Sequence, residues 1–134
     1  VETIISCVPT FVQKAGVTVL KEGKAPASVL LQELHQRRDI MVEGLNHLTG
    51  VSCFAPEGAF YAFANIRETG LTSEQFARLM LDKASVALLP GTNFGQWGEG
   101  YVRLCFATSI PEIREGLYRM AGVLENRLEK SVTV

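Results

Sequence analysis

One arginine on a short predicted strand is the residue whose type and place most clearly suggest chemistry. The stretch from Pro90 to Ala107 reads PGTNFGQWGEGYVRLCFA, with four glycines ahead of an alternating run. Side chains of a strand point to opposite faces in turn, so Arg103 falls on the face away from the apolar residues, which are Val102, Leu104 and Phe106. A guanidinium fixed on a strand can grip a carboxylate or a phosphate through two parallel hydrogen bonds. The alternative is a solvated arginine on an edge strand, because most arginines are exposed.

Two motifs together resemble a known family. The run from Pro90 to Ala107 resembles the C-terminal signature of the class I/II aminotransferases, the fold type I pyridoxal-phosphate enzymes related to aspartate aminotransferase. The upstream run from Pro56 to Phe63, PEGAFYAF, resembles the family's P-x-G-A-F-Y segment, in the family's order and at about its spacing. The resemblance covers nearly the whole chain. It implies that Arg103 binds the α-carboxylate of an amino-acid substrate and that Phe60 helps to wall the active site.

The resemblance also implies a reaction and a cofactor. The reaction moves an amino group between an amino acid and a 2-oxo acid, and the cofactor is pyridoxal 5'-phosphate, which needs a lysine for its Schiff base. The lysines of the chain are Lys14, Lys21, Lys24, Lys83 and Lys130. None has a serine-flanked context like that of the family's catalytic lysine, and the family's aspartate and phosphate loop are unmatched. We therefore expect no catalytic and no cofactor-binding residue here, and an isolated fragment that is inactive.

The family's organisation predicts two parts, a junction segment in residues 1–24 and the C-terminal small domain in residues 25–134. The junction carries a helical apolar stripe, with Ser6 as a candidate N-cap. The stripe is Val8, Phe11, Val12, Ala15 and Val19. The resemblance implies that this segment docks on a large domain and on the partner of a homodimer, with Ser6 near the subunit boundary; the alternative is a helix packed on its own domain. Because the chain starts at Val1 rather than Met, we expect a fragment or a processed product.

Hydrophobic periodicity predicts the remaining elements. Helices are expected over residues 26–48, 72–84 and 109–128, and short strands over residues 51–54, 59–65, 86–89 and 101–106. Capping boxes at Thr72 and Ser109 would open the second and third of these helices. Gly44 is expected to fray the end of the first, and the tail from Glu129 to be loose. The pattern predicts an α+β fold, a small, mostly antiparallel sheet with helices packed on one side.

The strand expected over residues 59–65 is aromatic on both faces. Phe60 falls on one face, and Tyr61 and Phe63 fall on the other. We expect Tyr61 and Phe63 to be core residues. A strand that is apolar on both faces is normally covered on both, so we expect part of its cover to come from outside this chain.

Composition and charge argue against nucleic-acid and membrane partners. The chain has 134 residues, 47% of them hydrophobic, with a formal net charge of −1. A sequence pI of about 6.2 gives no sign of the excess positive charge that nucleic-acid-binding domains carry. No apolar run is long enough for a membrane span, and no signal peptide opens the chain. The stretch from Gly95 to Gly98 formally matches the GXXG loop of KH modules, but Glu99 follows it and it holds no lysine or arginine.

The cysteines and histidines form no metal set. Cys7, Cys53 and Cys105 lie far apart without a C-x-x-C pair, which favours reduced thiols in a cytoplasmic compartment. Cys105 shares a strand face with Arg103, so a reactive thiol is conceivable, but we expect a small buried filler. His35 and His47 are expected to be structural.

A non-catalytic alternative stays open at this point. It is an α+β module that binds a small carboxylate or a protein partner. A catalytic-lysine segment in the flanking genomic sequence would decide for the aminotransferase.

Overall fold

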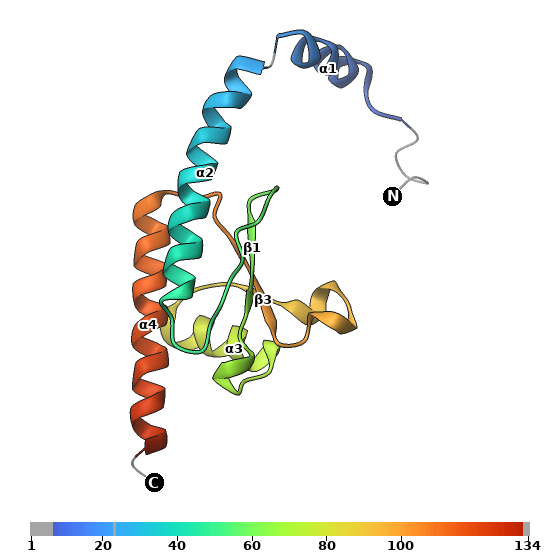
Figure 1. The fold of residues 1–134 in the computed structure, drawn as a ribbon. Helices are drawn as coiled ribbons and strands as arrows, with labels where there is room; N and C mark the ends of the chain where they lie inside the picture. Colours follow the sequence, from blue (N-terminus) through green and yellow to red (C-terminus); the bar gives the residue numbers. More distant parts are fainter. Residues whose placement is uncertain (1–6, 23, 133–134) are drawn as a thin grey trace. The chain divides into compact units, whose positions relative to one another are not determined.

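The computed structural model describes residues 7–22 and 24–132 (Figure 1). The chain divides into two units, of which the first ends at Glu33 and the second begins at Leu34. Helix α1 (Thr10–Glu22) belongs to the first unit, and helix α2 (Lys24–Asn46) begins in the first and ends in the second. The division into a junction of residues 1–24 and a domain of residues 25–134 stays a prediction.

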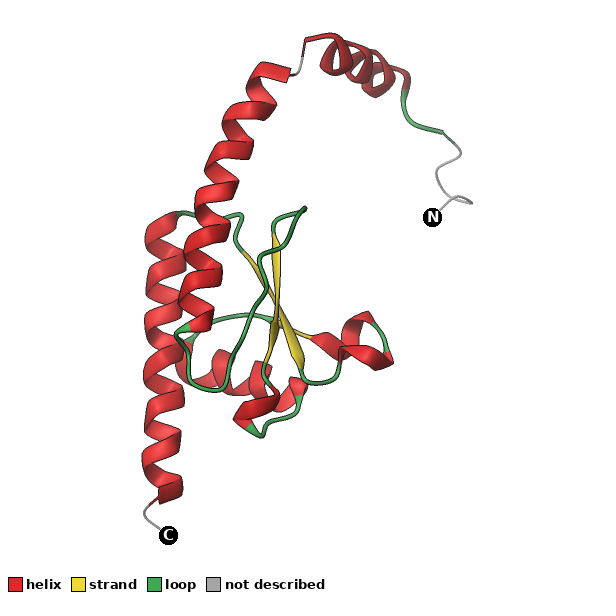
Figure 2. Ribbon diagram, in the orientation of Figure 1, coloured by secondary structure: helices red, strands yellow, loops and turns green. Residues whose placement is uncertain are grey.

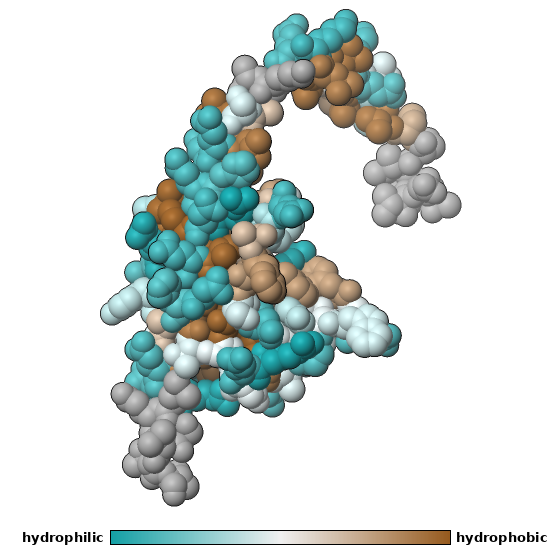
Figure 3. All heavy atoms as spheres, in the orientation of Figure 1, coloured by the Kyte–Doolittle hydropathy of each residue, from teal (hydrophilic) through white to brown (hydrophobic). Residues whose placement is uncertain are grey.

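Helix α1 has no buried residue. Figure 3 shows hydrophobic side chains at its surface. The exposed apolar residues of the first unit include Val8, Phe11, Val12, Val19 and Leu30. Leu30 lies on α2, whose described apolar residues are buried only from Met41 onward. The candidate N-cap Ser6 lies outside the described residues.

The second unit is built on a three-stranded antiparallel sheet of order β1-β3-β2. Strand β3 (Tyr101–Cys105) lies between β1 (Tyr61–Asn65) and β2 (Leu89–Pro90). Arg103 on β3 is opposite Phe63 on one side and opposite Leu89 on the other. The arginine therefore stands on the central strand, not on an edge.

Two of the predicted strands are much shorter than expected. Residues 51–54 make only a single bridge, between Ser52 and Asn65. The backbone of Cys53 is satisfied instead by the side chain of Asn46, whose Oδ1 accepts from the Cys53 N–H at 2.8 Å and whose Nδ2 donates to the Cys53 carbonyl at 3.0 Å. The strand predicted over residues 86–89 is limited to β2, because the Val86 N–H is donated to the Met80 carbonyl at 3.1 Å.

Helices pack on one face of the sheet, as predicted (Figure 2). They are the second half of α2, helix α3 (Ser73–Leu79) and helix α4 (Ile110–Val132). The largest fully buried side chains are Phe76, Phe106, Leu45, Ile66, Met80, Met120 and Val102. These residues come from all three helices, the central strand and the segments next to the strands, so they join the layers into one hydrophobic core.

The helix ends follow local chemistry. Thr72 and Gln75 form the predicted capping box of α3, and Ser109 and Glu112 form that of α4. Helix α3 continues as a π-helical turn, Met80–Ala84. The prediction of a loose tail from Glu129 is wrong as far as Val132, because α4 reaches that residue. The Leu128 side chain lies outside the described residues.

Gly44 does not fray the end of α2, which runs on to Asn46. A Cβ on Gly44 would lie 2.3 Å from Cδ1 of Leu117 in α4. The missing side chain lets the two helices approach closely, so this glycine is a packing residue.

The prediction that Tyr61 and Phe63 are core residues is wrong. Buried positions of β1 are Ala62 and Ala64, while Phe63 is 42% exposed. The reason is the register, which puts Tyr61 and Phe63 on the strand face away from the helices. Cys105, expected to be a buried filler, is likewise exposed.

Candidate functional site

Arg103 lies half-buried on the sheet face that the helices leave uncovered. Its guanidinium carbon Cζ lies 4.2 Å from the ring centroid of Tyr61 and 4.5 Å from that of Phe94, above both rings. Tyr61 comes from β1, and Phe94 ends a 3₁₀ turn, Gly91–Phe94, in the glycine-rich loop. Two aromatic faces from distant parts of the chain therefore hold one cation, each by a cation–π contact.

The donors of Arg103 have no partner among the described residues. It makes no hydrogen bond and no ion pair there, although a guanidinium carries five N–H donors in a rigid fork. No buried side-chain nitrogen or oxygen of the described part is left unsatisfied, so these donors reach the surface. The structure thus presents a fixed cation with its hydrogen-bonding capacity unused, which suits a planar anion such as a carboxylate.

Further rings extend this face of the sheet. Phe63 stacks on Tyr101 with 5.2 Å between ring centroids and 11° between planes. Phe63 also meets the edge of Phe94 at 6.1 Å and 82°. A second cation, Arg67, lies over Tyr101 with its Cζ 4.9 Å from the ring centroid. The uncovered face is therefore an aromatic surface with a guanidinium at either end.

Two glycines close the loop that carries Phe94. A Cβ on Gly91 would lie 2.1 Å from the carbonyl oxygen of Gly98, and a Cβ on Gly98 would lie 1.9 Å from that of Gly91. Real Cβ atoms do not approach backbone so closely. Only glycine at both places allows the two arms of the loop to touch, which explains part of the glycine density of the motif.

Glu99 ties the same loop to the start of α3. Its Oε1 accepts from the N–H of Ser73 at 2.9 Å, from the hydroxyl of Ser73 at 3.2 Å and from the N–H of Gly100 at 3.0 Å. The fully buried Ser73 hydroxyl also accepts from the Gly100 N–H at 2.9 Å. The hydrogen bond from the Ser73 backbone is the largest cause that holds the pKa of Glu99 below its usual range.

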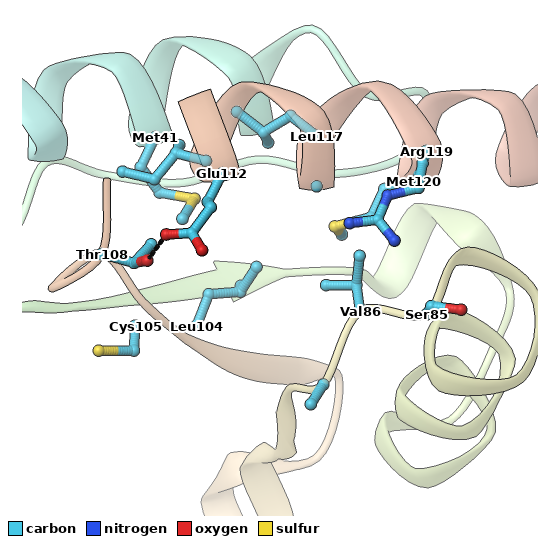
Figure 4. Close-up of a pocket in the computed structure, with 13 residues that line it drawn as sticks. Met41, Ser85, Val86, Leu104, Cys105, Thr108, Glu112, Leu117, Arg119 and Met120 are labelled. Atoms are coloured by element: carbon cyan, nitrogen blue, oxygen red, sulfur yellow. Dashed lines mark hydrogen bonds between the residues drawn. The ribbon is translucent and has the colours of Figure 1, made fainter. Parts of the chain in front are cut away.

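A cavity of about 170 Å³ lies on the helix side of the second unit (Figure 4). Its apolar lining includes Met41, Leu104, Leu117 and Met120. The charged groups at its edge are already engaged: Glu112 accepts from Thr108 and Ser109, and Arg119 pairs with Glu115. The bond from Thr108 is the first cause that lowers the pKa of Glu112. Both charged side chains of the lining are thus paired within the chain, so the stronger candidate site is the Arg103 face.

Comparison with known proteins decides the family. The family described as "Aminotransferase class I and II" matches residues 2–120 of the chain. The chain belongs to this family. Its sequence is 41% identical to aspartate aminotransferase of Pyrococcus horikoshii over 124 residues, and 38% identical to aromatic-amino-acid aminotransferase 2 of Thermococcus litoralis over 124 residues. Either alignment covers 91% of this chain and 32% of the relative. The chain thus spans about a third of the length of these aminotransferases.

A solved structure shows the same fold. The crystal structure of the aromatic aminotransferase from Pyrococcus horikoshii matches with a TM-score of 0.80 at 42% identity, over 88% of this chain and 32% of that one. The predicted fold class is confirmed: an antiparallel three-stranded sheet with helices on one side, as in aminotransferase structures.

Phe60, the other predicted substrate-binding residue of this aminotransferase chain, lies next to the Arg103 site. Its ring is 39% exposed and lies 4.6 Å, between centroids, from the ring of Tyr61. Its carbonyl accepts from the Phe106 N–H at 3.0 Å, which extends the pairing beyond β1. The Phe60 ring does not contact Arg103 directly. It contacts the ring of Tyr61, which in turn contacts Arg103.

The family uses pyridoxal phosphate, and the described residues do not fit its binding. No lysine lies on β1 or β3, beside Arg103. Lys83 borders a different hollow, with Leu79, Val123 and Arg127. The described part of the chain also holds no group of three or more residues able to ligate a metal ion, and no helix of that part is long and apolar enough to cross a membrane. The Arg103 face, as far as the structure describes it, thus offers a guanidinium and aromatic rings but no lysine to hold the cofactor.

Sequence reasoning found Arg103 but missed the residues that contact it. Strand alternation would have put Tyr61 on the Arg103 face had the register of β1 and β3 been known. Phe94 could not be found in this way, because its position depends on the path of a loop. No pattern in the sequence indicated that Arg67 would lie on this face.

Proposed function

We propose that this chain provides the α-carboxylate-binding part of an enzyme that transfers an amino group between an amino acid and a 2-oxo acid. Arg103 is the group that binds the carboxylate. One observation carries the proposal: Arg103 contacts two aromatic rings while none of its donors is engaged by a described residue. Because the cation is already positioned, little conformational entropy is lost when a carboxylate binds.

The chemistry of the reaction fits a single fixed arginine. Amino acid and 2-oxo acid both carry a carboxylate next to the carbon that gains or loses the amino group. One guanidinium can therefore orient both substrates, and the two rings that contact it shield part of the cation from water. The contribution of Arg103 is positioning, because two parallel hydrogen bonds fix the direction of the bond from the carboxylate to Cα.

Other parts of the protein must hold the cofactor. Pyridoxal phosphate, when bound, draws electrons from Cα, and this chain's described residues offer no group to anchor it. We infer that the lysine lies in a large domain of the same enzyme, and that this chain alone does not catalyse transfer. Phe60 would wall the site next to Tyr61. A cytoplasmic homodimer is the assembly we infer, supported by the family and by the three free thiols of the chain.

Replacement of Arg103 by lysine tests the proposal. In the full-length enzyme, Arg103→Lys keeps the charge and loses the fork, so one charge-assisted hydrogen bond of about 1.5–3 kcal/mol is lost. We expect kcat/KM to fall about ten- to a hundredfold for amino acid and 2-oxo acid alike. The melting temperature should hardly change, because Arg103 points away from the core.

Arg78→Lys is the matched control for that experiment. Arg78 is exposed on α3 and pairs with Asp82 at 3.6 Å. It should leave both kinetic constants unchanged. Near-normal turnover of Arg103→Lys would place the carboxylate site elsewhere, and early unfolding of that variant would make Arg103 a structural residue.

A further inference from the structure

A carboxylate clamp works only if its guanidinium plane keeps one orientation. An arginine side chain is long and rotamer-rich, and fixing it costs conformational entropy. A carboxylate that takes some of the N–H donors in a bidentate pair can do the fixing. No described residue does this for Arg103. Its specific contacts within the described part are the two aromatic rings, so those rings must supply the restraint.

The rings restrain the cation without using its donors. Cζ lies above both ring planes, at 4.2 Å from the centroid of Tyr61 and 4.5 Å from that of Phe94. Contact with two rings at once limits how far the cation can move without losing one of them, and this contact leaves the N–H donors without a hydrogen-bond partner among the described residues. The result is a cation restrained by two rings, with its fork left free for a ligand.

Phe94 has no other evident reason to stand where it does. It is 49% exposed, so it is not a core residue. Its ring contacts are Arg103 and the edge of Phe63. The turn that carries it belongs to a loop in which the backbones of Gly91 and Gly98 approach each other closely.

We propose that Tyr61 and Phe94 are positioning residues that fix the guanidinium plane of Arg103 for carboxylate binding. The inference rests on the proposed function of Arg103. It assigns the aromatic residues of this face a role in substrate affinity rather than in folding. The Tyr61 hydroxyl is not needed for this role, since a ring face is all that the contact requires.

The test uses the full-length enzyme, with L-aspartate, L-alanine and L-phenylalanine as amino donors and 2-oxoglutarate as acceptor. The ring-removing variants are Tyr61→Leu and Phe94→Leu, and the ring-keeping variants are Tyr61→Phe and Phe94→Tyr. We expect ring removal to raise KM for donor and acceptor roughly three- to tenfold, with a smaller change in kcat. The ring-keeping variants should return KM to within about twofold of the wild type. Trp97→Leu is the control, because Trp97 is an exposed aromatic residue of the same loop with no ring contact to Arg103.

A double-mutant cycle separates the inference from the proposed function. If Phe94 acts through Arg103, the effect of Phe94→Leu on KM should disappear in the Arg103→Lys background. An equal effect in both backgrounds, or a lower melting temperature without a change in KM, would overturn the positioning role. If Arg103→Lys strongly lowers kcat/KM while the ring-removing variants leave KM unchanged, the proposed role of Arg103 is retained and only this inference is overturned. If Arg103→Lys itself leaves kcat/KM unchanged, both the proposed function and this inference are overturned.

Discussion

Replacing Gly98 by alanine should open the loop that positions Phe94. The added Cβ would lie 1.9 Å from the carbonyl oxygen of Gly91, 2.3 Å from its carbonyl carbon and 3.0 Å from the nitrogen of Thr92. An ordinary carbon–oxygen contact is about 3.3 Å, so the two arms of the loop must separate by about 1.4 Å. All three obstacles are backbone atoms, which cannot rotate out of the way.

The cost can be estimated from what the separation breaks. Overpacking of this kind costs about 1–3 kcal/mol, and backbone obstacles put it at the upper end. The substitution would also strain the turn that Gly98 itself forms, because the Gly98 N–H donates to the Gly95 carbonyl at 3.0 Å. Losing this hydrogen bond adds about 1 kcal/mol. We expect Gly98→Ala to lower the free energy of unfolding by about 3–4 kcal/mol, a large share of a typical domain's stability.

Urea unfolding of the purified chain measures this loss. Circular dichroism reports the helices, and fluorescence of Trp97, the single tryptophan, reports the loop. Gly122→Ala in α4 is the control, since no atom lies within 4 Å of its added Cβ; it should gain up to about 1 kcal/mol. A Gly98→Ala chain whose unfolding free energy stays within about 0.5 kcal/mol of the wild type would refute the closed-loop geometry.

Two further predictions follow from the protonation and exposure of single groups. The folded pKa of Glu99 lies below its ordinary value of 4.5, first because of the hydrogen bond from the Ser73 N–H. The contribution of Glu99 to stability is therefore complete above that pH and is lost as the pH falls through the folded pKa. The difference in unfolding free energy between wild type and Glu99→Gln should be largest at pH 7 and shrink in acid, and a pH-independent difference would count against the Ser73–Glu99 contact. Among the thiols, burial raises the pKa of Cys53 while Cys7 and Cys105 are exposed, so a thiol-specific disulfide reagent at pH 8 should modify Cys7 and Cys105 quickly and Cys53 slowly, which peptide mapping can check.

Local signals in the sequence predicted much of this structure correctly. The capping boxes at Thr72 and Ser109 depend on residues three apart, and both form as expected. The apolar alternation of Val102, Leu104 and Phe106 gives the core face of β3, because burial on one face follows directly from a period of two. The helix layer over one sheet face follows from the same periodicities.

What the sequence could not predict depends on contacts between distant segments. Tyr61 and Phe63 look like core residues in isolation, and only the pairing of β1 with β3 puts them beside Arg103. The strand expected at Cys53 is lost to the side chain of Asn46, seven residues away, which no propensity scale describes. Gly44 weakens a helix by propensity, yet its absent side chain is what lets α4 approach α2.

A crystal structure of the full-length enzyme with a bound substrate analogue tests the central claim most directly. An α-methyl amino acid such as 2-methyl-L-aspartate keeps the α-carboxylate and lacks the Cα hydrogen, so it can bind without reacting. The account predicts both carboxylate oxygens at about 2.7–2.9 Å from two guanidinium nitrogens of Arg103, with the guanidinium still in contact with the rings of Tyr61 and Phe94. A carboxylate bound by other residues, with Arg103 facing solvent, would contradict it.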